Sequence, residues 1–346
     1  MSKTLPLLPR LAGLAAGLAF SFTCSLAAFA SDSAPANAAE LAPASGMAVA
    51  GSVAHSGYAT ATRPAAQAGN GGGRSQGALY RITRGGEMAY LFGTIHVGAT
   101  SFYPLAPQVS SALAGAGRLV LELDTRANDA FELAVLKHAS YPVGDHIRNH
   151  ISPGTLRRLT AALHASGIPL SSVSHLKPWM LANTLVGLEL ARSGYARAHG
   201  NESFLLNAVQ ARGADVAELE SADYQLSLFD TLGDSDAEAY LREALDDLSS
   251  GVSMKKSKAV IAAWMSGDAA ALDALMADTV GACTVTSDFT RRTLLDRRNP
   301  QMAQRIEHIM KDGTVSFVGV GLLHLLGENG LPQLLSQRGY QVERMH

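Results

Sequence analysis

Two short segments, more than two hundred residues apart, share one pattern, and this pattern restricts the possible folds of the chain more than any other feature. The segments are YLFGTIHVG at 90–98 and FVGVGLLHLLGENG at 317–330, and each runs from apolar residues into a glycine and then a histidine. An apolar stretch that ends at glycine predicts a buried strand. Ligands of α/β proteins bind beyond the carboxyl ends of parallel strands. If the two strands pair in one sheet, His96 and His324 therefore lie at the same edge.

Each segment begins a strand, a helix and a second strand, which together make a βαβ-like unit. The expected elements lie at 90–92, 104–117 and 118–123 in the first unit and at 314–321, 331–339 and 340–345 in the second. Between the units, from about 150 to 310, helical patterns dominate. The sequence therefore predicts an α/β fold in which two βαβ-like units form a sheet core that carries a helical insertion.

The insertion contains recognisable helix starts. Ser152 precedes a proline, which is the arrangement of an N-cap followed by proline at the first helical position. A further helix is expected at 178–194, and Asn201 is expected to open another. A short strand, ADVAELE at 214–220, interrupts the helices before they resume at about 224–310.

The first thirty residues have the pattern of a secretory signal peptide. Lys3 and Arg10 precede an apolar run at 11–22, and Ala-Phe-Ala at 28–30 is a small-x-small cleavage site. An uncleaved membrane anchor is the alternative, but the run is interrupted by glycine and is shorter than the ~20 residues of a membrane span. We therefore expect cleavage after residues 1–30, no stable membrane anchor afterwards, and a protein that is periplasmic or secreted.

The composition of the next segment differs from that of a folded domain. Residues 31–78 are rich in Ala, Ser, Gly and Pro, and this composition cannot offset the conformational entropy that ordering removes. We predict a disordered linker at 31–78 and one folded domain at 79–346. Cys283 is the only cysteine after signal cleavage, so no intrachain disulfide is expected. The 28 basic and 30 acidic residues nearly balance, which gives no indication of nucleic-acid binding.

Polar residues at the ends of the expected strands are candidates for a functional site. Glu122 lies in the apolar strand RLVLELD, where a buried carboxylate needs a partner or an ion. Glu220 ends the short strand, and His96 and His324 follow glycines. The alternatives are structural: a hydrogen-bonded histidine at a strand end, or carboxylates that face solvent. No G-x-G-x-x-G, G-x-S-x-G, H-E-x-x-H or Walker pattern is present.

The order of several loose motifs is more specific than any one of them. These are YLFGTIHVG, YPLAPQVSSAL, LVLELD, HLKPWMLA, AELES, RRNPQMAQRIE and VGVGLLHLLGENGLPQLLSQRGYQVER. Together they resemble the TraB/GumN family, which includes PrgY and, more remotely, the Tiki proteins, and the resemblance runs from about residue 79 to 345. It implies an α/β core related in outline to the erythromycin-esterase and ChaN-like groups. Tiki relatives act as metal-dependent peptidases, and PrgY-type members are associated with blocking a peptide pheromone.

The resemblance also assigns site positions. The matching residues are Gly93, His96, Glu122, Glu220, Arg298, Asn299 and His324. One departure lies before the expected helix at 201, where many members have Gly-Val-Asp and this chain has Gly-Asn-Glu. Glutamate is one methylene longer than the aspartate of those members. If the acid at this position has a role, Glu202 has to fill it with the longer side chain.

The resemblance implies a metal site made of His96, Glu122, Glu220 and His324, because imidazoles and carboxylates suit Zn²⁺, Mn²⁺ or Co²⁺. Our leading hypothesis is metal-dependent hydrolysis of a peptide, with Glu122 as ligand or general base and Glu220 as ligand or orienting carboxylate.

The catalytic set in this hypothesis extends beyond the ligands. Besides Glu122 and His96, it includes Arg298 and Asn299, which would contact the substrate or an oxyanion.

Two other hypotheses stay open. His96, oriented by Glu122, could activate water for ester cleavage without a metal, and turnover would then resist chelators. Alternatively, the domain only binds a peptide or a glycan, in which case replacing either residue would spare its function.

Overall fold

The computed structural model describes residues 76–124 and 129–345. The predicted signal peptide and nearly all of the predicted linker lie outside these residues. The last three linker positions, 76–78, are described, and they are buried. The Gln76 side chain donates to the Phe102 carbonyl at 2.7 Å, and the Gly77 amide donates to the Trp264 carbonyl at 2.6 Å. The packed part of the chain therefore includes residues just before the predicted domain boundary.

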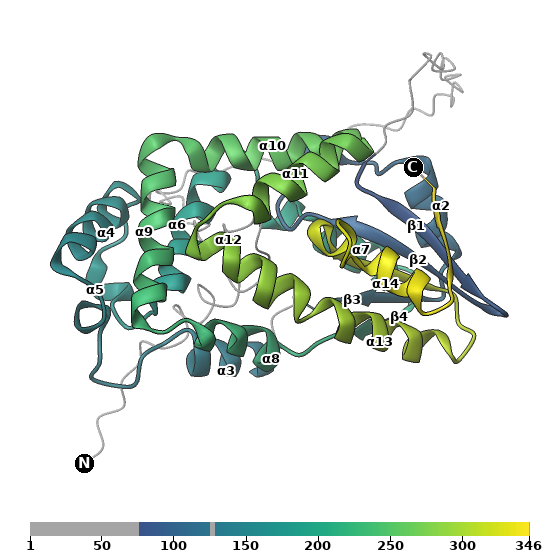
Figure 1. Cartoon of the computed structure of the whole chain (residues 1–346), viewed down its shortest axis with the longest axis horizontal. Helices are drawn as coiled ribbons and strands as arrows, with labels where there is room; N and C mark the ends of the chain where they lie inside the picture. The colour runs from purple at the N-terminus through teal and green to yellow at the C-terminus, as the bar shows by residue number, and fades with distance from the viewer. Residues whose placement is uncertain (1–75, 125–128, 346) are drawn as a thin grey trace, which may run out of the picture. The chain divides into compact units, whose positions relative to one another are not determined.

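Within the described residues, six strands form one sheet in the order β4-β3-β5-β2-β1-β6. Strands β1 to β4 of this sheet are labelled in Figure 1. The strands are β1 (Leu79–Arg84), β2 (Glu87–Thr94), β3 (Arg118–Leu121), β4 (Asp215–Glu218), β5 (Ser316–Gly321) and β6 (Gln341–Arg344).

The two predicted βαβ-like units interleave instead of lying side by side. Strand β5 of the second unit lies between β2 and β3 of the first and is parallel to both, and β4 is parallel to β3. The register pairs Thr94 with Gly321 and Leu121 with Gly319. The predicted α/β class is confirmed, and the carboxyl ends of these four strands share one edge of the sheet.

Strand β1 is an element that the sequence analysis did not include. It pairs with β2 as an antiparallel hairpin across Gly85 and Gly86, and Gly85 has a φ of 60°. A Gly-Gly pair between two strand-like runs is a known hairpin signal. Strand β6 then adds to β1 in antiparallel orientation at the edge of the sheet.

The remaining chain is largely helical, as predicted. The α-helices are α2 (Pro107–Gly115), α3 (Asp129–His138), α4 (Pro153–Ala165), α5 (Leu170–Val173), α6 (Pro178–Arg192), α7 (Asn201–Gln210), α8 (Ala222–Ser227), α9 (Asp234–Ser250), α10 (Val252–Ser266), α11 (Ala269–Gly281), α12 (Val285–Phe289), α13 (Asn299–Met310) and α14 (Leu331–Gln337). The predicted cap of α4 is present, since the Ser152 hydroxyl accepts the Thr155 amide at 3.3 Å. Asn201 is the first residue of α7, whereas Gly200 occupies the N-cap.

Two large apolar clusters and one small one support the fold. One of the large clusters surrounds the sheet, and the other lies among the inserted helices, where the Trp179 and Phe229 rings stack with centroids 4.0 Å apart. No single helix among the described residues is long and apolar enough to cross a membrane. The segments Ala269–Gly281 and Val285–Met310 reach that criterion only as a pair, which is bent by 113°.

Candidate functional site

The four predicted residues lie just beyond the ends of four neighbouring parallel strands. His96 follows β2, Glu122 follows β3, Glu220 follows β4, and His324 follows β5. All except Glu220 have less than a tenth of their surface exposed, and the side chain of Glu220 is only 4% exposed. The topology thus gathers residues from across the sequence at one buried edge.

Glu122 is held by partners on both of its carboxylate oxygens. Arg298 donates from Nη2 to Oε2 at 2.6 Å, and the Gly321 amide donates to Oε1 at 2.6 Å. Burial alone would raise the pKa of Glu122, but His324, Arg298, His96 and the Gly321 amide together lower it to about 2. Glu122 is therefore charged at neutral pH.

His324 is fixed by a residue from the start of α13. Its Nδ1 bonds the Asn299 side-chain oxygen, and the Asn299 amide nitrogen donates to the Asn329 carbonyl at 2.7 Å. Its Nε2 lies 3.7 Å from Oε1 of Glu122. Burial lowers the pKa of His324 to about 3, so the imidazole is neutral at pH 7. With both ends of its amide engaged, Asn299 is placed to orient His324.

His96 is paired with the acid at which this chain departs from the family pattern. Its Nδ1 lies 2.9 Å from Oε1 of Glu202, which is in the first turn of α7. Burial raises the pKa of Glu202, but the charge and hydrogen bond of His96 and the Thr94 hydroxyl outweigh burial and lower it. The longer Glu202 side chain therefore does reach the site, and Glu202 rather than Glu122 contacts His96 Nδ1.

The two residues before Glu202 bring α7 close to the site. A side chain at Gly200 would place its Cβ 2.4 Å from the His96 carbonyl oxygen, so only glycine permits this approach. The Asn201 side chain accepts the Ile95 amide at 2.8 Å. Sequence reasoning expected Asn201 only as a helix start, and an asparagine that binds the backbone of another segment leaves no local signal.

Glu220 is bound to Arg298. The guanidinium donates from Nη2 to Oε2 of Glu220 at 2.6 Å and from Nε to both oxygens at 3.1 Å. Gln225 adds a bond to Oε2 at 2.6 Å. Burial lowers the pKa of Arg298, but Glu220 and Glu122 raise it above its usual range. Arg298 thus acts as a buried cation between two carboxylates.

The sequence model of the TraB/PrgY/gumN family matches residues 78–344. The chain belongs to this family. It is also similar to the uncharacterized protein YbaP of Shigella flexneri and of Escherichia coli K12, each 25% identical over 251 residues, which cover 72% of this chain and 89% of the relative. No solved structure shows a significant match. The family resemblance read from the ordered motifs is therefore confirmed.

In this TraB/PrgY/gumN protein, the side chains of Glu122, His96 and His324 surround the space beside the Cα atom of Gly321. A Cβ added there would lie 3.2 Å from Oε1 of Glu122, 3.4 Å from Nε2 of His96 and 3.7 Å from Cδ2 of His324. No group of three or more His, Cys, Asp or Glu residues in the described chain is already arranged as a metal-ligand set.

The chemistry of the donor set nevertheless fits a metal ion. Imidazoles that bind metals usually have their other nitrogen bonded to an oxygen acceptor. Here Nδ1 of His96 lies 2.9 Å from Glu202 Oε1, and Nδ1 of His324 bonds Asn299. Nε2 of His324 lies near Glu122, and Nε2 of His96 lies near Gly321. Two imidazoles and one carboxylate are a common catalytic ligand set for zinc.

The segment before Arg298 is a π-helix, η5, at Thr290–Asp296. Such segments are rare and are frequent at functional sites. The carboxylate of its last residue, Asp296, accepts a hydrogen bond from the side-chain amide of Asn329 at 2.9 Å. The backbone carbonyl of Asn329 in turn accepts a hydrogen bond from the side-chain amide of Asn299. The end of the π-helix is thus linked to Asn299 through Asn329.

Proposed function

We propose that this family member is a metal-dependent hydrolase that cleaves peptides. The observation that supports the proposal is the matched arrangement of His96 and His324, each with Nδ1 held by an oxygen acceptor and Nε2 near Glu122 or Gly321. Under this proposal His96, His324 and Glu122 hold a divalent ion. When bound, such an ion acidifies water and polarises a carbonyl group.

The remaining polar residues then position the ligands. Glu202 and Asn299 fix the orientation of the two imidazoles. Arg298 keeps Glu122 charged and ties it to Glu220, which in this arrangement orients and does not bind the ion. Arg298 also supplies a buried positive charge beside the place where a substrate oxyanion would develop.

The peptide substrate is inferred from the family resemblance, since the remote Tiki relatives act as metal-dependent peptidases. If residues 1–30 act as a signal peptide, the substrate is a periplasmic or secreted peptide.

A second candidate function rests on the His96–Glu202 pair. A histidine whose Nδ1 lies 2.9 Å from a carboxylate oxygen resembles a general base paired with an acid, and it could activate water for ester cleavage without a metal. This alternative predicts hydrolysis that resists chelators and is lost in Glu202→Gln.

The deciding experiment measures bound metal and peptide cleavage in the same samples. The chain is stripped with a chelator and reconstituted with Zn²⁺, Mn²⁺ or Co²⁺. Metal content is read by plasma mass spectrometry, and cleavage of a peptide mixture by mass spectrometry. The site variant is His96→Ala with His324→Ala. The matched control is His164→Ala with His308→Ala, two exposed histidines on α4 and α13.

Nearly one ion per chain, lost only in the site variant, together with cleavage that returns on reconstitution, supports the proposal. No metal in the reconstituted wild type refutes the metal-dependent mechanism. Chelator-resistant hydrolysis then favours the His96–Glu202 mechanism, and peptide capture without cleavage favours a binding protein.

A further inference from the structure

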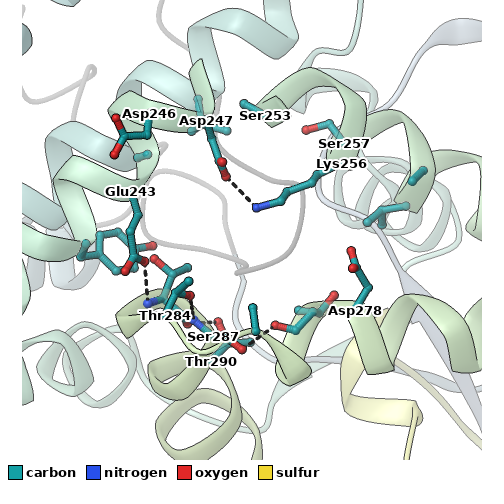
Figure 2. A pocket seen from close by; sticks show the side chains of 18 of the residues that line it. Glu243, Asp246, Asp247, Ser253, Lys256, Ser257, Asp278, Thr284, Ser287 and Thr290 are labelled. Carbon is teal, nitrogen blue, oxygen red and sulfur yellow. Dashed lines mark hydrogen bonds and ion pairs between the residues drawn. The ribbon is translucent and has the colours of Figure 1, made fainter. Parts of the chain in front are cut away.

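A cavity of about 350 Å³ lies among α6, α9, α10, α11 and α12, and none of the candidate site residues lines it (Figure 2). This volume is in the range of small-molecule sites. Its apolar wall includes Val186, Val260 and Leu275. The cavity therefore combines a hydrophobic surface with the polar residues labelled in Figure 2.

The charges around this cavity are predominantly negative. Glu243, Asp247 and Asp278 line it, and Lys256 is the cation among the lining residues. Lys256 pairs with Asp247 at 2.8 Å, as the dashed line in Figure 2 shows. Three carboxylates against one ammonium leave an excess of two negative charges. Asp246 also lines the cavity, but it is excluded from this count because it pairs with an arginine on α4.

Not all of these carboxylates are equally available to a ligand. Glu243 accepts the amides of Val285 and Thr286, each at 2.9 Å, at the start of α12. Asp278 is exposed at the cavity rim, and no ion pair or hydrogen bond to it is found within the described residues. Asp278 is therefore the carboxylate best placed to meet a cationic group.

Ser253 provides an independent observation that points to a ligand. It is on α10, lines the cavity and is only 6% exposed, and its hydroxyl has no hydrogen-bond partner among the described residues. A buried hydroxyl without a partner is destabilising, so such groups call for an explanation. A bound molecule that offers a hydrogen bond in the cavity supplies one.

The geometry points to a second ligand site that takes a primary ammonium group on a short aliphatic body. Asp278 attracts the ammonium, Ser253 bonds a polar atom of the ligand, and the wall formed by Val260 and Leu275 packs against the aliphatic part. The same chemistry occurs in a free aliphatic amine and in the amino terminus of a peptide.

Calorimetric titration of the full-length chain at pH 7 tests this site without any assay of hydrolysis. The probes are 1,4-diaminobutane, alanyl-leucine amide with a free amino terminus, and the N-acetylated form of that peptide. The variant Asp278→Asn removes the exposed charge. Its matched control is Asp273→Asn, an exposed residue on the same helix, α11, that does not line the cavity.

At least one of the two unblocked amines is expected to bind, and the acetylated peptide is not. Binding of the diamine alone identifies a free amine as the ligand class, and binding of the peptide alone identifies an amino terminus. Asp278→Asn should weaken binding about tenfold, whereas Asp273→Asn should not, because a charge-assisted hydrogen bond is lost only in the first.

Ser253→Ala separates a ligand role from a packing role. Removing an unpaired buried hydroxyl should leave the melting temperature unchanged or raise it, while the affinity for the amine falls by about threefold or more. The proposal is refuted if neither amine binds at millimolar concentration, if acetylation makes no difference, or if the variants at 278 and 273 bind equally well.

Discussion

Replacing Arg298 with methionine tests whether this guanidinium supports the whole site. The variant leaves Glu122 and Glu220 buried without their shared cation. His324, Arg298, His96 and the Gly321 amide together lower the pKa of Glu122 from 4.5 to about 2, which corresponds to about 3 kcal/mol of stabilisation at neutral pH, and Arg298 contributes part of it. Removing one member of a buried ion pair typically costs about 3 to 5 kcal/mol. We expect a loss in this range at pH 7.

The pH dependence of this loss has a definite sign. A carboxylate with a lowered folded-state pKa stabilises the protein above pH 4.5, and this stabilisation disappears as the pH falls towards 2. Without Arg298 the pKa of Glu122 rises, because one of the positive charges that lower it is gone. The difference in unfolding free energy between wild type and Arg298→Met should therefore be largest at pH 7 and should shrink as the pH falls through 4.5.

Urea unfolding of both proteins at several pH values is the assay, and Arg291→Met is the matched control. Arg291 is 40% exposed and pairs with Asp288 at 2.6 Å. An exposed pair contributes only about 0 to 1 kcal/mol. Adding Glu220→Gln to Arg298→Met should restore part of the loss. A loss for Arg298→Met no larger than that for Arg291→Met would refute the reasoning.

Three further predictions concern the same edge of the sheet. Gly321→Ala puts a methyl group into the space between the candidate ligands. It should lower peptide cleavage at least about tenfold, with little change in melting temperature. Unchanged cleavage would contradict the proposed ligand positions. Gly200→Ala forces a contact with the His96 carbonyl oxygen and should lower the melting temperature clearly, whereas Gly115→Ala, which meets nothing within 4 Å, should not. An NMR titration of His324 should give a pKa of about 3, so that folding stability falls as the pH drops from 6.5 towards 3, and titration near 6.5 would contradict its burial as a neutral imidazole.

The sequence predicted the parts of the fold that depend on local patterns. The apolar strand at 90–92, the helix at 178–194 and the cap at Ser152 are all present. Strand β1 was missed because LYRITR has neither a strict alternation of apolar and polar residues nor a long apolar run. The placement of β5 between β2 and β3 is a non-local pairing, and no local pattern specifies it.

The contacts of the candidate site also divide into those that a sequence pattern predicts and those that depend on the tertiary structure. The rule that ligands gather beyond strand ends made His96 and His324 candidates, the apolar strand around Glu122 made that residue one, and the family resemblance joined them in one site. The rule could not show that Glu202, on a helix, would hold His96, or that Arg298 would bind Glu220. These contacts depend on how α7 and α13 pack against the sheet edge, which only the tertiary structure defines.

Because β5 lies between β2 and β3, the candidate site can form only after the C-terminal part of the chain has been synthesised. Strand β5 is made more than two hundred residues after β2, yet it lies between β2 and β3 and supplies the amide that binds Glu122. Until β5 emerges from the ribosome, the facing edges of β2 and β3 lack their partner, and contacts between such distant segments form slowly. A nascent chain that stops before His324 therefore cannot assemble this cluster of polar side chains.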